Sequence, residues 1–162
     1  MKVIFLDIDG VMNSWAGLIK RGGQSLMGIY QEHEEVLDWV LRHTDAKLVI
    51  SSTWRLTHKL KGFQSSELFS YGLIPRSVID VTPAKMDAFR GREIQMWLEK
   101  SRESLAVEDF VILDDDSDMG PYMDHLIQTS GEYGLTYREG LMIIERFQEP
   151  SYVNEKIWRS KK

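Results

Sequence analysis

The strongest constraint on the fold lies in the first ten residues. An apolar run over residues 3–6 ends in two carboxylates one residue apart, Asp7 and Asp9, followed by Gly10. A continuous apolar run is typical of a strand buried on both faces, as in a parallel sheet. Ligands of such sheets bind beyond the carboxyl ends of the strands, where a glycine lets the backbone approach closely. These residues alone leave two interpretations open, a functional site and a solvated Asp-Gly turn.

A second apolar run with the same kind of ending favours the functional interpretation. Residues 110–113 are apolar, and four acids follow them: Asp114, Asp115, Asp116 and Asp118. Gathered carboxylates repel one another unless a cation neutralises them, and oxygen-rich sites of this kind suit Mg²⁺. We therefore predict a magnesium site.

Length and composition set outer limits. With 162 residues, 43% of them hydrophobic, the chain fits one domain over residues 1–162, in which a polar tail from about residue 149 packs loosely. The absence of cysteine excludes disulfides and thiolate metal sites and fits a reducing compartment. No signal-peptide pattern and no stretch of bilayer-spanning length occur, so we expect a cytoplasmic protein with no membrane partner. The net charge of −5 argues against a broadly basic nucleic-acid-binding surface, and the oligomeric state is not readable.

Strands are expected to alternate with helices along the chain. We predict further strands over residues 46–50, 77–81 and 125–129, and helices over 32–42, 54–63, 65–73, 90–100 and 136–147. This alternation indicates an α/β protein with a mainly parallel sheet flanked by helices on both faces. Residues 14–30, with four glycines, are expected to form a flexible excursion that is either a flap over the site or an ordinary loop. His33 and His43 are interpreted as surface residues.

A phosphate-binding segment is predicted at the end of the strand over residues 46–50. The sequence Ser51-Ser52-Thr53 follows that strand and leads into a helix. Hydroxyls and free backbone N–H groups at such a position can cradle an anion, although simple N-capping explains the same residues. The helix over residues 90–100 is expected to supply a cation to the site.

Four short segments, taken in order, carry a family resemblance. Asp7-Ile-Asp9-Gly10-Val11, the strand end Ser51-Ser52, a basic residue between Lys85 and Arg92, and Asp114-Asp115-x-x-Asp118 resemble the four motifs of the haloacid dehalogenase-like (HAD) phosphohydrolase superfamily. The segments Ser51-Ser52-x-Trp54-Arg55, Thr82-Pro83 and Arg90-Gly-x-Glu93-Ile94 further resemble small stand-alone HAD proteins, including the HAD domain of some RNA-repair proteins. The resemblance spans nearly the whole chain and implies a Rossmann-like HAD fold without a sizeable cap domain.

The resemblance also implies catalytic roles. Asp7 would be the nucleophile that forms an aspartyl-phosphate, and Asp9 the general acid and then the base. Mg²⁺ would be held by the Asp7 carboxylate, the Asp9 backbone carbonyl and Asp114 or Asp115. Asp118 is a further candidate for a metal ligand. Ser51 would bind the transferring phosphoryl group, assisted by backbone N–H groups of Asp9 and Ser52.

Other implied assignments concern the cation and the substrate. Arg90 is preferred as the third-motif cation, with Lys85 and Arg92 as alternatives, and Ser52, Arg55 and Lys85 are expected to bind substrate. An uncapped site favours a large phosphorylated substrate such as a nucleic-acid terminus, whereas a flap over residues 17–28 could enclose a nucleotide. Hydrolysis and phosphotransfer both fit these motifs. The alternative function is a non-catalytic HAD module that binds a phosphorylated ligand or a partner protein, although the paired acids Asp7 and Asp9 speak against it.

Overall fold

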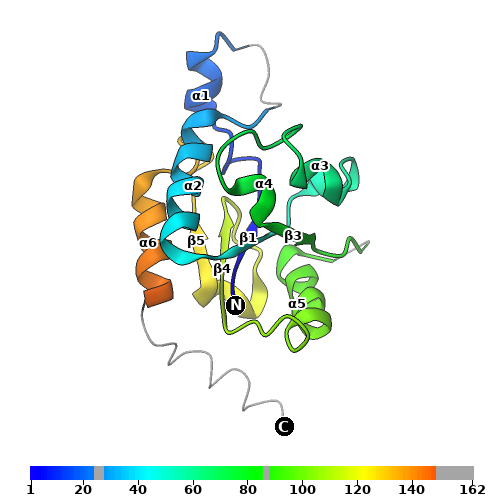
Figure 1. The fold of residues 1–162 in the computed structure, drawn as a ribbon. Coiled ribbons are helices and arrows are strands. Elements are labelled where there is room, and N and C mark those ends of the chain that lie inside the picture. The colour runs from blue at the N-terminus through cyan, green and yellow to red at the C-terminus, as the bar shows by residue number, and fades with distance from the viewer. Residues whose placement is uncertain (24–27, 86–87, 149–162) are drawn as a thin grey trace.

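Five parallel strands form the centre of the computed structural model, which describes residues 1–23, 28–85 and 88–148 (Figure 1). The strand order is β3-β2-β1-β4-β5, with every pairing parallel. The strands are β1 (Lys2–Leu6), β2 (Lys47–Ile50), β3 (Val78–Val81), β4 (Asp109–Asp114) and β5 (Leu126–Gln128). The predicted α/β class and parallel sheet are therefore confirmed, whereas the predicted tail from residue 149 lies outside the described residues.

The central strand β1 shows why an uninterrupted apolar run was needed. Its side chains alternate between two cores, with Ile4 and Leu6 in one and Val3 and Phe5 in the other. All four are fully buried. Because β1 is hydrogen-bonded to β2 on one side and to β4 on the other, the carboxyl ends of these three strands lie next to one another.

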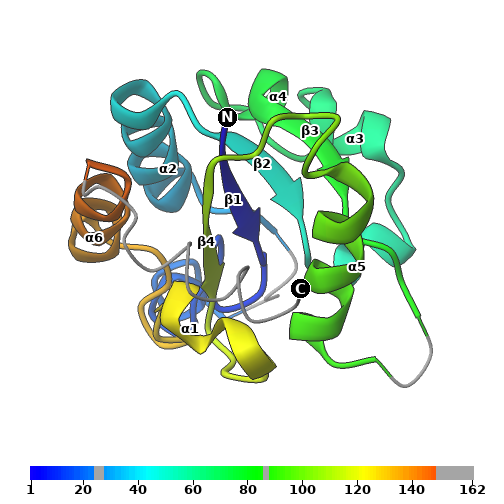
Figure 2. The same cartoon turned by 90° about the horizontal axis from the view of Figure 1, so that it is seen from below.

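Helices cover both faces of the sheet (Figure 2). The apolar residues of α2 (Gln31–Thr44), α3 (Leu60–Gln64), α4 (Ile74–Ser77) and α6 (Tyr137–Gln148) join one core. The other core contains α5 (Arg90–Ser101) and the 3-10 helix η2 (Gly120–His125). In this second core, Trp97 packs edge-on against Phe5 with ring centroids 5.3 Å apart.

Some predicted elements differ from the structure. The excursion over residues 14–30 contains a short helix, α1 (Trp15–Lys20), at whose start the Ser14 hydroxyl accepts the Gly17 N–H; residues 24–27 of the predicted flap are outside the described chain. The helix predicted over residues 54–63 is instead the 3-10 helix η1 (Thr53–Leu56) followed by α3.

The helix predicted over residues 65–73 is wrong. The backbone there forms turns, and its N–H groups donate to acids on α2: Ser70 N and Tyr71 N to Glu34, and Leu73 N to Asp38. Side-chain acceptors thus take the place of the carbonyl groups that a helix would supply.

The surface position predicted for His33 is also wrong, because only 4% of the residue is exposed. Its Nδ1 lies 2.8 Å from the Leu135 carbonyl oxygen, and its Nε2 lies 3.2 Å from the Ser14 hydroxyl. His43, in contrast, is exposed as predicted.

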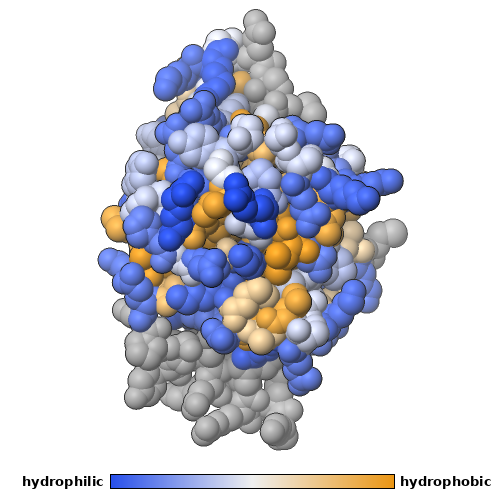
Figure 3. All heavy atoms as spheres, viewed as in Figure 1, coloured by the Kyte–Doolittle hydropathy of each residue, from blue (hydrophilic) through white to orange (hydrophobic). Residues whose placement is uncertain are grey.

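The connections between strands hold no large inserted domain in the described chain. Within it, the intervals from β1 to β2 and from β2 to β3 hold only short helices, turns and the helix α2, and no large cap stands over the strand ends. None of the helices that the structure describes is long and apolar enough to cross a membrane. On the face seen in Figure 3, hydrophobic side chains form separate groups between hydrophilic ones.

Candidate active site

The two acidic clusters meet at the carboxyl ends of β1 and β4. Asp7, Asp114 and Asp115 each offer a carboxylate oxygen that lies within 4.8 Å of the other two. Asp7 is 6% exposed and Asp114 is fully buried, whereas Asp115 is half-buried. The Asp7 N–H donates to the Leu113 carbonyl oxygen at 3.0 Å, which continues the β1–β4 pairing into the site.

Burial makes this cluster electrostatically costly. Burial and the nearby Asp7 carboxylate raise the pKa of Asp114 to about 7. Burial likewise raises the pKa of Asp7 and of Asp115, and repulsion from Asp7 adds to the shift of Asp115. The Asp114 Oδ2 atom is buried and has no hydrogen-bond partner among the described residues. Three carboxylates with such an oxygen fit a hard divalent cation.

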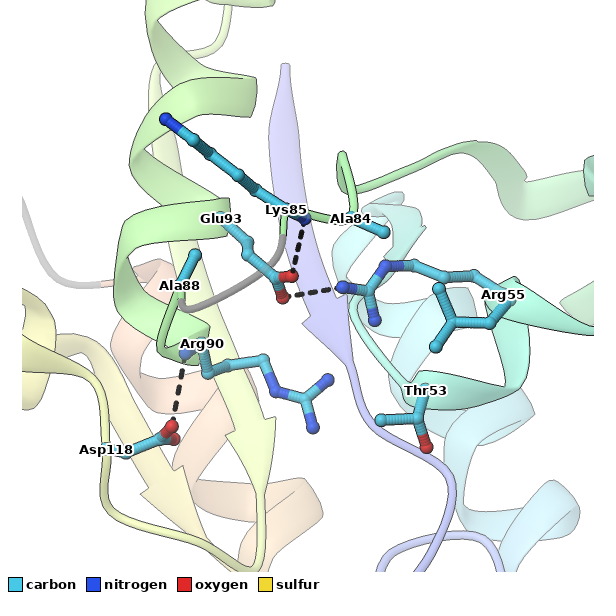
Figure 4. A pocket seen from close by; sticks show the side chains of 9 residues that line it. Thr53, Arg55, Ala84, Lys85, Ala88, Arg90, Glu93 and Asp118 are labelled. Carbon is cyan, nitrogen blue, oxygen red and sulfur yellow. Dashed lines mark hydrogen bonds and ion pairs between the residues drawn. The ribbon is translucent and has the colours of Figure 1, made fainter.

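Arg90 is the cation that reaches these acids. Its Nη2 lies 3.5 Å from Asp7 Oδ1, and its Nε lies 3.3 Å from Asp114 Oδ2. The residue opens α5, and its backbone N–H donates to Asp118 Oδ2 at 3.1 Å (Figure 4). Asp118 is thus bonded to the start of the helix and does not belong to the cluster of Asp7, Asp114 and Asp115. Gly91 allows this approach, because a Cβ there would collide with the Met119 backbone.

The two alternatives to Arg90 lie differently. Lys85 is exposed, and its side chain points away from the Arg90 guanidinium in Figure 4. Arg92 donates from Nη1 to Gln95 on the exposed surface of α5 at 2.9 Å. Of the three basic residues considered from sequence, Arg90 therefore has the geometry expected of the third-motif cation.

Asp9 is exposed beside this cluster, and two neutral donors hold its carboxylate. Asn13 Nδ2 donates to Oδ1 at 2.8 Å, and Trp54 Nε1 donates to Oδ2 at 2.9 Å. The Asn13 side chain also accepts the Gly10 N–H at 2.9 Å. Gly10 adopts a positive φ of 74°, and a Cβ there would collide with the Asp115 carboxylate. Only glycine fits at this point, where the loop after β1 passes close to the loop after β4.

The serines after β2 lie next to Asp7. Both are fully buried, and the Ser51 hydroxyl has no hydrogen-bond partner among the residues described. The Ser52 hydroxyl accepts the Trp54 N–H at 3.3 Å, which confirms the capping interpretation. It also lies close enough to the Asp7 carboxylate to lower the pKa of Asp7, although burial, which raises that pKa, has the largest effect and Arg90 lowers it more than Ser52 does.

Arg55 supports this serine segment from inside the protein. Its guanidinium donates to the carbonyl oxygens of Ser51, Ser52 and Thr82 at 2.7 to 3.0 Å, and to the Glu93 carboxylate at 2.6 Å. The Arg55 side chain is 4% exposed and that of Glu93 is 10% exposed. Substrate contact by Arg55 stays a prediction, but these bonds give the residue a structural role.

Two cavities flank the acids. The larger, about 420 Å³, lies between η1 and the start of α5 and includes Thr53, Leu56, Lys85 and Arg90 in its lining (Figure 4). The smaller, about 180 Å³, is lined by Asp9, Asn13, Trp15 and Asp115, together with glycines of the two loops. The larger cavity thus reaches the site at Arg90, and the smaller reaches it at Asp9 and Asp115.

Sequence reasoning missed two residues that contact Asp9. Asn13 follows Asp9 at a spacing of four residues within the same turn, a local signal that could have indicated the contact. Trp54 lies 45 positions from Asp9, and no periodicity or spacing in the sequence joins them.

Of the comparisons with known proteins, the one with family models agrees with the resemblance seen in the sequence. One crystal structure aligns with this chain at 11% sequence identity and a TM-score of 0.41, and the alignment covers 91% of this chain and 80% of the other. A search of curated proteins gave no match. The family model described as the HAD domain in Swiss Army Knife RNA repair proteins matches residues 3–139, a stretch that contains all four motif segments. The chain therefore belongs to the family of HAD domains found in Swiss Army Knife RNA repair proteins.

Proposed function

We propose that the protein is a Mg²⁺-dependent phosphomonoester hydrolase that works through an aspartyl-phosphate on Asp7. Its proposed substrate is the phosphorylated end of a nucleic acid or a nucleotide. The observation that carries this proposal is the meeting of Asp7, Asp114 and Asp115 within 4.8 Å at adjoining strand ends. HAD family membership supports the hydrolase class.

Asp7, Asp114 and Asp115 are the side chains that would hold the metal. The pKa of Asp114 is raised even though Arg90 Nε lies 3.3 Å from its Oδ2, which indicates that Arg90 only partly compensates the negative charge of the cluster. A bound Mg²⁺ would supply the remaining compensating charge and stabilise the negative charge that develops on the transferring phosphoryl group.

The chain's own residues account for two chemical steps. In the first, an Asp7 carboxylate oxygen forms a bond to phosphorus while the bond from phosphorus to the leaving oxygen breaks, and Asp9 donates a proton to that oxygen. In the second, Asp9 takes a proton from water, whose oxygen attacks phosphorus and releases Asp7 and inorganic phosphate. Asp9 is restored to its protonated form at the end of the cycle.

Two groups with spare hydrogen-bonding capacity could bind the phosphoryl oxygens. The Ser51 hydroxyl and Arg90 Nη1 are buried and have no hydrogen-bond partner within the described chain. Buried polar atoms of this kind are costly unless a ligand satisfies them. A phosphoryl group in contact with Asp7 would bring acceptor oxygens to both donors.

The surroundings of the acids support a nucleotide or nucleic-acid substrate. No large cap encloses the strand ends in the part of the chain that the structure describes, so a polymer end could reach Asp7. Trp15 lines the smaller cavity beside Asp9 and is 55% exposed, which offers an aromatic surface to a base. The family description names RNA repair proteins.

The test is phosphate release from an aryl phosphate, nucleoside monophosphates, and oligonucleotides phosphorylated at the 5′ or 3′ end, with Mg²⁺ and with chelator. We expect metal-dependent release that Asp7→Asn abolishes and Asp45→Asn retains, since the Asp45 side chain is 98% exposed and lies outside the site. Added alcohol acceptors would separate hydrolysis from phosphotransfer. If Mg²⁺ binds but no substrate loses phosphate, the non-catalytic binding module is the better description.

A further inference from the structure

We propose that Trp54 is a positioning residue for Asp9, through the hydrogen bond from its indole N–H to the carboxylate. This inference rests on the proposed function, in which Asp9 is the general acid and base. Trp54 would not touch the reacting atoms. Its role would be to fix the orientation of the group that transfers the proton.

The two donors to Asp9 together define the plane of its carboxylate. Asn13 reaches Oδ1 at 2.8 Å and Trp54 reaches Oδ2 at 2.9 Å, so each oxygen receives one N–H from a neutral side chain. A single donor would leave an exposed carboxylate free to rotate about that bond. Two donors, one on each oxygen, stop this rotation, and a catalytic group must be held closely to be effective.

The Trp54 indole is held in place by packing against the hydrophobic core. The His58 ring stacks on Trp54 with a centroid separation of 5.4 Å and an interplanar angle of 23°. His58 in turn meets Phe63 edge-on at 6.1 Å, and Phe63 is fully buried. Trp54 also packs against the core that contains Phe63. The position of the donor is therefore set by the protein interior.

The location of Trp54 links the acid to the phosphoryl-binding segment. Trp54 belongs to η1, whose N-cap is Ser52, so its indole and the two serines are parts of one short turn after β2. Asp9 belongs to the loop after β1. The Trp54–Asp9 bond thus joins the loop that carries the proposed acid to the turn that carries the proposed phosphoryl-binding hydroxyls.

The test uses Trp54→Phe, which keeps an aromatic ring for His58 and removes the indole N–H. We expect kcat/KM for an alkyl phosphate to fall about tenfold, the effect of losing one hydrogen bond of ordinary strength. The value for an activated aryl phosphate should fall by less than about twofold, because its leaving group needs little protonation. Trp39→Phe, a substitution on α2 where Trp39 packs against Tyr137, is the matched control and should change neither value.

A double-mutant cycle with Asp9→Asn separates positioning from general damage. If Trp54 acts through Asp9, Trp54→Phe should cost little once Asp9 is already replaced. Equal losses on both classes of substrate, or an undiminished loss in the Asp9→Asn background, would overturn the proposal.

A measurement without metal or substrate tests the contact itself. In the ¹H–¹⁵N spectrum, Asp9→Ala should shift the Trp54 indole N–H signal and leave that of Trp97 in place. Asp80→Ala is the comparison, since Trp97 Nε1 donates to Asp80 at 2.8 Å, and it should produce the reverse pattern. An unmoved Trp54 signal would refute the contact, whereas an inactive wild-type protein with the expected shifts would refute the proposed hydrolase and leave the contact established.

Discussion

Replacing Asp114 with Asn should make the metal-free protein more stable at alkaline pH. Asp114 is fully buried, and burial together with Asp7 raises its pKa from 3.8 to about 7. At pH 8 the carboxyl is ionised in both the folded and unfolded states. The folded state then bears the free-energy cost of a buried negative charge next to Asp7. At about 1.4 kcal/mol per pKa unit, a shift of roughly three units corresponds to about 4 kcal/mol.

The pH dependence follows from the direction of this shift. Below the unfolded pKa the carboxyl is protonated in both states, and its contribution to stability is intact. That contribution is lost as the pH rises towards about 7, the pKa of the folded state. The amide side chain of the Asp114→Asn variant cannot ionise. The free energy of unfolding of the variant should therefore exceed that of wild type at pH 8 by about 2 to 4 kcal/mol, and the two should converge near pH 4.

The assay is urea unfolding in the presence of chelator at pH 4 and pH 8, followed by circular dichroism. Asp116→Asn is the matched control, because Asp116 belongs to the same acidic run but is exposed. Its effect should stay within about 0.5 kcal/mol at both values of pH. Equal stability of wild type and Asp114→Asn at pH 8, or a less stable variant, would refute the electrostatic reasoning.

The same pair of proteins should respond differently to magnesium. A ligand that binds only the folded state stabilises it in proportion to the logarithm of its concentration relative to Kd. Added Mg²⁺ should therefore raise the free energy of unfolding of wild type at pH 8 and leave Asp114→Asn nearly unchanged. A similar gain in both proteins would show that Asp114 does not hold the ion. Two other predictions concern buried partners outside the acid cluster. Glu93→Gln should lower the free energy of unfolding by about 3 kcal/mol, because it leaves the Arg55 charge in a site that is 4% exposed; exposed Glu99→Gln on the same helix should have almost no effect in the same urea titration. Burial lowers the pKa of His33, so stability should fall as the pH drops below about 6.5, where the unfolded chain gains a proton that the folded protein resists. His33→Gln should flatten this part of the pH profile, and a profile unchanged by the substitution would contradict the assignment.

The sheet and the acid cluster were predictable because their signals are local. Strands buried on both faces need continuous apolar runs, and their carboxyl ends gather at one edge whatever the intervening sequence. The helix start at Thr136 was readable for the same reason. The Glu139 carboxylate accepts the Thr136 N–H at 3.1 Å, and the Thr136 hydroxyl accepts the Arg138 N–H at 3.3 Å. All three residues lie within four consecutive positions.

The failures share a different physical cause, which is contact between distant segments. The turns over residues 65–73 are stabilised by Glu34 and Asp38, about 35 positions earlier in the chain. His33 is buried against Leu135, 102 positions away. The Trp54 bond to Asp9 belongs to the same class. Propensity and periodicity describe a residue's near neighbours, so these interactions become visible only once the fold brings the segments together.

The first turn of α5 shows how the fold converts one local element into support for two parts of the site. Arg90 and Glu93 are three residues apart and therefore lie on the same side of the helix. Arg90 reaches Asp7 and Asp114, and Glu93 holds Arg55, whose other donors fix the carbonyl groups of Ser51 and Ser52. A displacement of α5 would move the cation away from the acids and release the serine segment at the same time. The close approach at Gly91, where any Cβ would meet the Met119 backbone, sets the position of this turn against the loop after β4. The charge balance at Asp7 and the placement of the serines therefore both depend on how the first turn of α5 packs against the loop after β4.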